Sequence, residues 1–267
     1  MRAILHIMQA VVLITGFIFM GACSTVPRSF HPIEPISPGQ FSYQELDTAL
    51  KVHVKDGVVS YISIAQDDRF QVHIQQLDRV DPLQLPTRLD RLAFWINAYN
   101  AFAIQGILDG YSPMTLWGRY RYFIARECRV GGQTINLYDL EQKVLIPDFQ
   151  DPRIHFAIVC ASKSCPKLRS EVFIADALDD QLDESARAFI NDPTRNRFDR
   201  ERRVAHLSMI FKWFERDFAA QAGSLIHYLR KYVADPVLAN DLERQPYRVE
   251  FLECDWSLNG ISRVDQS

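Results

Sequence analysis

The sequence predicts a single α+β domain that is mostly helical, with one central buried helix and a small antiparallel sheet. Residues 88–108 are apolar nearly all round, and a helix with that pattern is buried. Two pairs of short β-prone segments, at residues 120–137 and 198–207, flank turn residues and indicate hairpins. Amphipathic or apolar helical patterns occupy most of the remaining chain, so helices outnumber strands.

Composition fits a globular protein with a substantial core. The chain has 267 residues, of which 48% are hydrophobic and 12% aromatic. Its 30 Lys and Arg against 33 Asp and Glu give a net charge of −3, so no basic surplus favours a nucleic-acid partner. We find no internal repeat and no later apolar run long enough to span a bilayer.

The N-terminus has the order of a secretory signal. Arg2 precedes an apolar run over residues 10–20, and Gly21-Ala22 comes directly before Cys23. A cysteine at that place indicates a lipoprotein signal, in which residues 1–22 are removed and the Cys23 thiol is lipidated. An uncleaved membrane anchor is the alternative. Ser24 rather than aspartate after the cysteine resembles an outer-membrane sorting signal, so we expect a lipid anchor in that membrane and a domain facing the periplasm.

A tether follows the expected lipidation site. Residues 23–40 carry four prolines, and such a stretch is extended and packs poorly. We therefore expect the folded domain to cover residues 41–267.

Helices are expected first in the folded domain. Ser42 and Glu45 form a capping-box pattern before a helix over residues 42–54, and Asp56-Gly57 is a turn signal. Thr87 can cap the buried helix. The other expected helices cover residues 62–77, 138–146, 176–190 and 224–233, with a further one starting near residue 211.

Strands are expected at three places. Gly131-Gly132 lies between residues 120–129 and 133–137, and the charged turn 199–203 lies in the second hairpin. Residues 248–254 form a late strand. The run 155–160 fits either a helix or a buried strand, because its length is too short for periodicity to decide.

Two asparagines lie inside the buried helix. Asn97 and Asn100 are three residues apart and so lie on neighbouring positions of one face. A buried amide without hydrogen bonds costs about 1–3 kcal/mol on protein scales. Both amides therefore need partners: either a neighbouring backbone, which is a structural role, or a substrate or imidazole in a cleft.

The segment from His155 to Pro166 gathers several reactive side chains. It holds His155, Cys160 and Cys165 together with two serines and a lysine. A cysteine beside a histidine can act as a thiolate nucleophile with a general base. The same residues can also be core side chains or a disulfide. One histidine with a Cys-x4-Cys spacing does not match a zinc site, so we expect no metal, and nothing indicates a cofactor.

Three other cysteines and one carboxylate complete the candidates. With Cys23 lipidated, Cys128, Cys160, Cys165 and Cys254 permit three complete pairings or remain thiols. Asp255 follows the late strand and either caps the C-terminal loop or orients His155. Residues 208–217 read as core plus a solvated face.

Five ordered motifs resemble the bacterial and plant family called domain of unknown function 547. The resemblance covers roughly residues 41–259 and implies a domain of secreted or lipid-anchored proteins, without an established reaction. Cys254 stands where we expect the family to have tyrosine, which makes it a poor nucleophile candidate. The motifs are residues 57–61, 94–100, 151–166, 208–218 and 255–259.

Two functions remain open. In a cysteine-dependent hydrolase or acyl-transfer enzyme, Cys160 is the nucleophile and His155 the base, with Asp255 or Asn97 orienting the imidazole. Asn100 and Cys165 would then line the same site. In a non-catalytic envelope module, a surface of exposed aromatics binds a protein or a glycan; the aromatics expected there are Trp117, Tyr120 and Tyr122.

Overall fold

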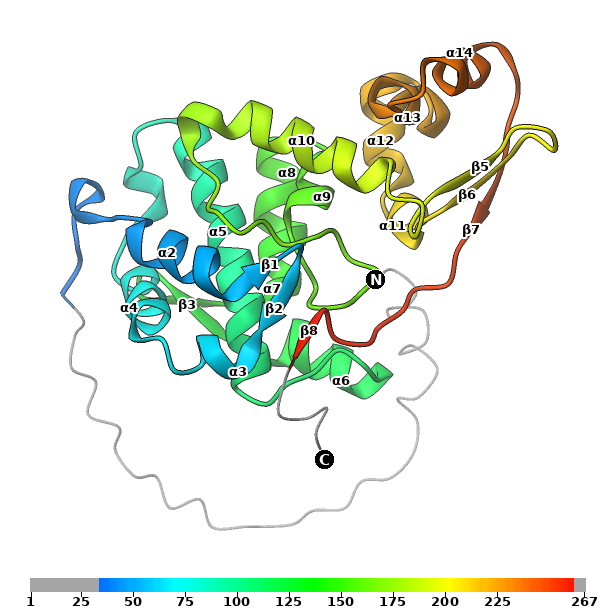
Figure 1. Cartoon of the computed structure of the whole chain (residues 1–267). Coiled ribbons are helices and arrows are strands. Elements are labelled where there is room, and N and C mark those ends of the chain that lie inside the picture. The colour runs from blue at the N-terminus through cyan, green and yellow to red at the C-terminus, as the bar shows by residue number, and fades with distance from the viewer. Residues whose placement is uncertain (1–33, 262–267) are drawn as a thin grey trace, which may run out of the picture. The chain divides into compact units, whose positions relative to one another are not determined.

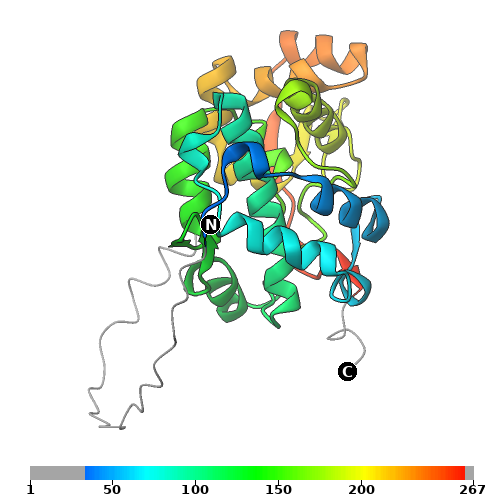
Figure 2. The same ribbon diagram turned by 90° about the vertical axis from the view of Figure 1, so that its left-hand side faces the viewer.

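The long helix α5 (Arg88–Leu108) is the centre of the fold, as predicted. In the computed structural model, which describes residues 34–261, Thr87 and Asp90 form a reciprocal capping box at its start. Its 21 residues make a helix roughly 30 Å long. Figures 1 and 2 show α5 between the blue and cyan helices of the N-terminal part and the green helices that follow it. The expected signal, Cys23 and most of the tether lie outside the described residues.

The N-terminal part contains one unbroken α-helix, a hairpin, a second helix that is broken in two, and two short 3₁₀ turns. The first predicted helix is confirmed, although Ser42 accepts a hydrogen bond from the Gln44 N–H instead of forming a box with Glu45. The predicted helix 62–77 is interrupted, because Asp67 caps a new helix by accepting from the Arg69 N–H. The elements are η1 (Pro38–Gln40), α2 (Gln44–His53), β1 (Val54–Lys55), β2 (Val58–Ser60), α3 (Tyr61–Ile64), α4 (Asp68–Leu77) and η2 (Pro82–Gln84).

The middle of the chain is more helical than predicted. Residues 120–125 were expected to be strand but form helix, because Thr115 caps a turn and Tyr122 is buried. The hairpin around Gly131-Gly132 is confirmed in a shorter form. The elements are α6 (Leu116–Tyr120), the π-helical η3 (Arg121–Ala125), β3 (Cys128–Val130), β4 (Gln133–Ile135), α7 (Leu137–Asp139), the π-helical η4 (Leu140–Leu145) and α8 (Ile146–Phe149).

The C-terminal part contains the second hairpin, the helix that holds residues 178–190, and several shorter helices. The run at His155 begins as a helix, and the predicted helices near residues 176–190 and 224–233 are confirmed. Helix α14 was not predicted. The elements are α9 (Ile154–Ala157), η5 (Ala175–Ala177), α10 (Leu178–Ile190), β5 (Arg197–Asp199), β6 (Val204–Leu207), α11 (Met209–Trp213), α12 (Glu215–Ala222), α13 (Leu225–Tyr232), α14 (Pro236–Arg244), β7 (Arg248–Phe251) and β8 (Gly260–Ile261).

The strands within residues 34–261 form three small sheets, two of which contain a parallel pair. Strand β7 pairs in parallel with β6, so the expectation of purely antiparallel pairing is wrong there. Strand β8 also pairs in parallel with β2, which brings the end of the chain back to the N-terminal hairpin (Figure 1). These two pairs join distant parts of the chain, which local turn signals cannot reveal.

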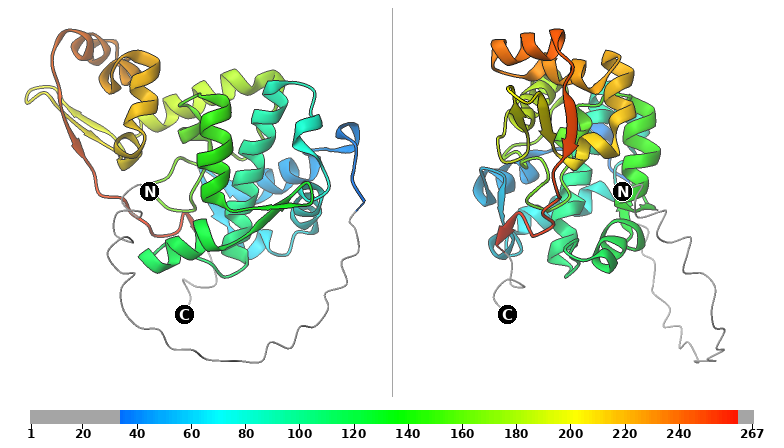
Figure 3. Two further views of the ribbon diagram at one scale, coloured as in Figure 1. Left: turned by 180° about the vertical axis from the view of Figure 1, so that it is seen from behind. Right: turned by 90° about the vertical axis from the view of Figure 1, so that its right-hand side faces the viewer.

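Two hydrophobic cores support the domain. The larger surrounds α5 and includes side chains from α2, α4, α7 and α9. The smaller is rich in aromatic rings and lies among α10–α13 and the β5–β6–β7 sheet. Figure 3 shows the ribbons of α11–α13 and of this sheet beyond one end of α10. The predicted mostly helical α+β class is confirmed. None of the helices within residues 34–261 has both the length and the hydropathy needed to cross a bilayer.

Candidate functional site

Asn97 holds the chain that enters α10. Its side-chain amide donates to the Phe173 carbonyl oxygen at 2.7 Å, and the Phe173 N–H donates back to Asn97 Oδ1 at 2.9 Å. The residue is 2% exposed. Because its amide is occupied by backbone, Asn97 does not orient an imidazole, and that predicted role is corrected to a structural one.

Asn100 makes the same kind of clamp one helical turn later. It donates to the Ala157 carbonyl oxygen at 2.9 Å and accepts from the Val159 N–H at 3.0 Å. These contacts fix the chain where α9 ends and the Cys160 segment begins. Asn100 therefore positions the cysteine loop through its backbone and does not face a cleft.

Cys160 and Cys165 form a disulfide that closes a short loop. The Cys160 N–H and the Ser162 hydroxyl both donate to Cys165 Sγ, at 3.2 and 3.4 Å. A disulfide sulfur carries no thiolate, so in this form Cys160 is not a nucleophile. Of the remaining cysteines in the described range, Cys128 and Cys254 are unpaired thiols.

The disulfide loop is held from both sides. Arg195 donates to the carbonyl oxygens of Lys163 and Cys165, in each case at 2.9 Å. The Lys163 N–H donates to the Ser257 carbonyl oxygen at 2.9 Å. Ala161 adopts φ +57°, an uncommon conformation for a residue with a Cβ. The loop is thus fixed in an unfavourable backbone conformation by its neighbours.

His155 is buried and pairs with Asp217. Its Nε2 lies 2.9 Å from Asp217 Oδ2, and its ring stacks on Phe214 with centroids 3.8 Å apart. Burial lowers the pKa of His155, and the Asp217 carboxylate partly opposes that shift. Nδ1 has no hydrogen-bond partner among the described residues. The orienting carboxylate is therefore Asp217, which sequence reasoning assigned to a solvated face.

Asp255 has the first of the two roles considered for it, that of a loop cap. Its carboxylate accepts from the Ser257 N–H at 2.9 Å and from the Ser257 hydroxyl. Those hydrogen bonds hold the pKa of Asp255 below its ordinary value. Its backbone N–H donates to Ser164 Oγ at 2.7 Å. Asp255 is thus a loop cap beside the disulfide, and the alternative in which it orients His155 is wrong.

Glu141 is a buried acid that the sequence did not reveal. It lies in the π-helical η4 and is 3% exposed. Burial raises its pKa to about 8, and the charge of Asp217 adds to that rise. π-Helical segments occur often at functional sites. No signal marked Glu141 in the sequence, because a glutamate in an amphipathic helix is normally solvated.

The aromatic surface is smaller than predicted. Trp117 and Tyr120 stack with centroids 5.2 Å apart, and Trp117 is 67% exposed. Tyr122 is buried and donates its hydroxyl to the Ala103 carbonyl oxygen at 2.6 Å, so its inclusion was wrong. Met114 and Leu116 are exposed instead. We call Met114, Leu116, Trp117 and Tyr120 the α6 surface.

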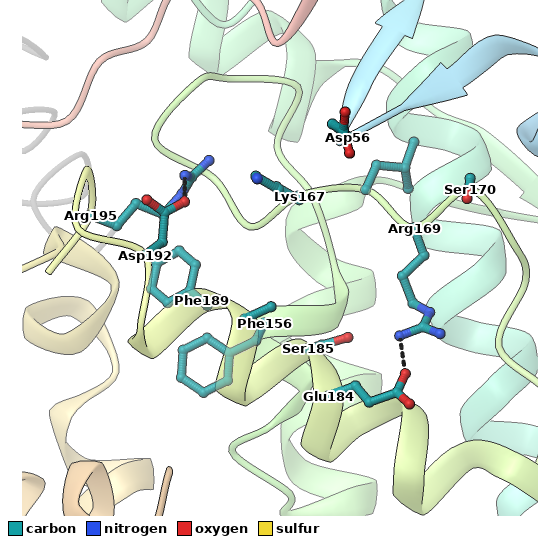
Figure 4. Close-up of a pocket in the computed structure, with 13 residues that line it drawn as sticks. Asp56, Phe156, Lys167, Arg169, Ser170, Glu184, Ser185, Phe189, Asp192 and Arg195 are labelled. Atoms are coloured by element: carbon teal, nitrogen blue, oxygen red, sulfur yellow. Dashed lines mark hydrogen bonds and ion pairs between the residues drawn. The ribbon is translucent and has the colours of Figure 1, made fainter. Parts of the chain in front are cut away.

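A cavity of about 400 Å³ lies next to the disulfide loop. Its walls come from the β1–β2 turn, the segment after Cys165, and α10 with the residues that follow it. Figure 4 shows charged side chains around it and two phenylalanine rings below. Within residues 34–261, no group of three or more His, Cys, Asp or Glu side chains is arranged to hold a metal ion.

The fold and these sites define an α+β domain whose buried polar motifs serve largely to hold backbone. Residues 83–190 match the model of a family described as a protein of unknown function, DUF547. The match supports the family that the motifs resemble, and it includes both asparagines, His155 and the disulfide loop. No curated protein and no solved structure matches the chain.

Proposed function

We propose that this is a cell-envelope lipoprotein whose folded domain binds another protein through the α6 surface. The lipid on Cys23 anchors it in the outer membrane, and the domain faces the periplasm. The observation that carries the binding role is the disulfide: Cys160 and Cys165 occupy each other, while His155 is paired with Asp217. Cys160 as nucleophile and His155 as base are therefore not paired with each other. Large side chains of the α6 surface, by contrast, are exposed to solvent.

The composition of the α6 surface favours a protein as the occupant. Trp, Tyr and Met are enriched in the cores of protein interfaces, and so is Arg, which occurs here as Arg119 and Arg121. Arg119 lies over the Trp256 ring at 4.4 Å, which extends the surface toward the late strand. We expect a partner with an apolar centre and an acidic rim.

Cysteine-dependent hydrolysis or acyl transfer is the second candidate. It is favoured by the two donors that point at Cys165 Sγ, because they would stabilise a thiolate once the disulfide is reduced. Alkylation of the reduced, folded protein near neutral pH separates the candidates. A Cys160 or Cys165 that reacts much faster than a thiol of ordinary pKa, about 8.5, and slows in His155→Ala supports the enzyme. Uniformly slow thiols support the binding module.

The anchor is tested in cells. Labelled fatty acid should enter the wild-type protein and be absent from Cys23→Ser, since that thiol is the proposed acceptor. Membrane fractionation should place the wild type in the outer membrane. Equal labelling of both proteins contradicts the anchor, and recovery from the inner membrane contradicts the sorting.

The α6 surface is tested by photo-crosslinking in living cells. A photoreactive amino acid at Leu116 should capture one protein, and the same residue at the exposed Leu83 serves as the matched control. The captured protein, once purified, should bind the wild-type domain and bind Trp117→Ala at least about tenfold more weakly, the size expected of an interface anchor. Unchanged affinity of Trp117→Ala contradicts the surface, and capture of a glycan instead contradicts the choice of a protein.

A further inference from the structure

The cavity beside the disulfide loop has features that the binding surface on α6 does not explain. It lies between Asp56-Gly57 of the β1–β2 turn, residues 167–170, and the exposed side of α10. Its volume of about 400 Å³ is within the range of small-ligand sites, which hold roughly 300–1,000 Å³. Gly57 adopts φ +83°, and a Cβ there would come within 2.7 Å of Lys167 Cβ. The turn and the Lys167 stem are therefore packed together, which fixes one rim of the cavity.

Most charges of the cavity are already neutralised by one another. Arg169 Nη1 lies 2.9 Å from Glu184 Oε2. Arg195 pairs with Asp192, and Asp192 also accepts from the Thr194 N–H at 2.9 Å. Both ion pairs are drawn in Figure 4. These four side chains form polar walls of the cavity. Because their charges are already paired, they favour a charged ligand only weakly.

Two charges of the cavity are left without such partners. Lys167 and Asp56 are both exposed, and neither forms an ion pair or a side-chain hydrogen bond within the part of the chain that the structure describes. The Lys167 charge does act on Asp192. Against the effect of burial, hydrogen bonds from Thr194 and the charges of Arg195 and Lys167 hold the pKa of that carboxyl below its ordinary value. Figure 4 shows Lys167 between Asp56 and the Asp192–Arg195 pair, so a cation and an anion border the same opening. A ligand that carries one charge of each sign can satisfy both without adding net charge.

The floor of the cavity is apolar. Phe156 and Phe189 line it from below and stack on each other with centroids 5.1 Å apart. Leu168 contributes to the same lining. The two rings are only 1% and 3% exposed, so an apolar group of the ligand meets them through van der Waals contact at the base of the cavity. The cavity thus combines two opposite charges at the rim with an apolar base.

We infer that the cavity binds a zwitterionic amino acid or short peptide with an apolar side chain. Its carboxylate contacts the Lys167 ammonium, its ammonium contacts the Asp56 carboxylate, and its side chain lies over Phe156 and Phe189. The inference is independent of the α6 surface, because the residues of the two sites do not overlap.

Calorimetric titration of the full-length protein tests the inference with two probes, phenylalanine and alanylphenylalanine. At least one of them should bind. Its N-acetylated form lacks the ammonium and its C-terminal amide lacks the carboxylate, so each should bind at least about tenfold more weakly, as expected for loss of one charged hydrogen bond. Lys167→Gln and Asp56→Asn should each weaken the unmodified probe by a similar factor.

Controls separate charge recognition from general loss of structure. Lys163→Gln removes a nearby exposed lysine that does not line the cavity and should leave affinity unchanged. Lys167→Gln should not further lower the affinity for the C-terminally amidated probe, because that probe has no carboxylate to contact Lys167. Failure of both probes to bind, equal affinity for the capped and unmodified forms, or unchanged affinity in Lys167→Gln would each overturn the inference.

Discussion

The asparagines of α5 and the ionisable residues Glu141 and His155 are all buried, but they differ in how far their polar atoms are satisfied by hydrogen bonds. Each asparagine gives and receives one backbone hydrogen bond. Glu141 is shifted by burial toward its neutral form, and His155 leaves Nδ1 without a partner. A buried amide that makes both of its hydrogen bonds therefore joins two segments of the chain, whereas a buried acid or imidazole still responds to pH.

Removing an asparagine clamp should have the largest effect. Asn97→Leu leaves the N–H and the carbonyl of Phe173 unpaired, at about 1–3 kcal/mol for each buried group. Urea unfolding should therefore show that the free energy of unfolding falls by about 2–6 kcal/mol. The substitution Asn240→Leu, at an exposed position, should change that free energy little. A loss as small as that of the control would mean that Phe173 finds other partners and that the clamp is not a joint.

Replacing the buried acid should change the pH dependence of stability. The folded-state pKa of Glu141 is raised to about 8 from 4.5. The stability that the protein gains from protonated Glu141 is therefore fully present below pH 4.5 and is lost as pH rises through 8. Glu141→Gln removes this loss. We expect the free energy of unfolding of the variant to rise relative to that of wild type by up to about 1.4 kcal/mol per pH unit between pH 5 and 8. Parallel stability curves for the two proteins, measured by urea unfolding, would contradict the shift.

Neutralising the partner of His155 should have a smaller effect, seen best by NMR. Burial lowers the His155 pKa and Asp217 opposes it, so Asp217→Asn should move the imidazole titration to lower pH. Because the folded pKa is depressed, stability is lost as pH falls below the unfolded value, and this loss should extend further in the variant.

Asp255→Asn is the matched control for that titration. Its carboxylate is bound to Ser257, so the His155 midpoint should stay where it is in wild type. A shift in Asp255→Asn together with none in Asp217→Asn would reverse the assignment of the orienting carboxylate.

Features that depend on neighbouring residues were predictable, and those that depend on distant ones were not. Helix α5 follows from its apolar pattern and the Thr87 cap, and the need of Asn97 and Asn100 for partners follows from the cost of burial. The partners themselves lie 76 and 57 residues away, and Asp217 lies 62 residues from His155. The aromatic residues 120–125 favour a strand locally, but burial of Tyr122 against α5 overrides that preference.

Strand β8 has a consequence for the order of folding. Val59 and Ser60 pair with Gly260 and Ile261, so the N-terminal sheet is incomplete until nearly the whole chain is available. A growing or translocating chain exposes the unpaired edge of β2 throughout that time, and such an edge can pair with other chains. Strand β8 therefore closes this sheet after the rest of it has formed. A chain that ends before residue 260 lacks the third strand of the sheet and leaves the edge of β2 unpaired.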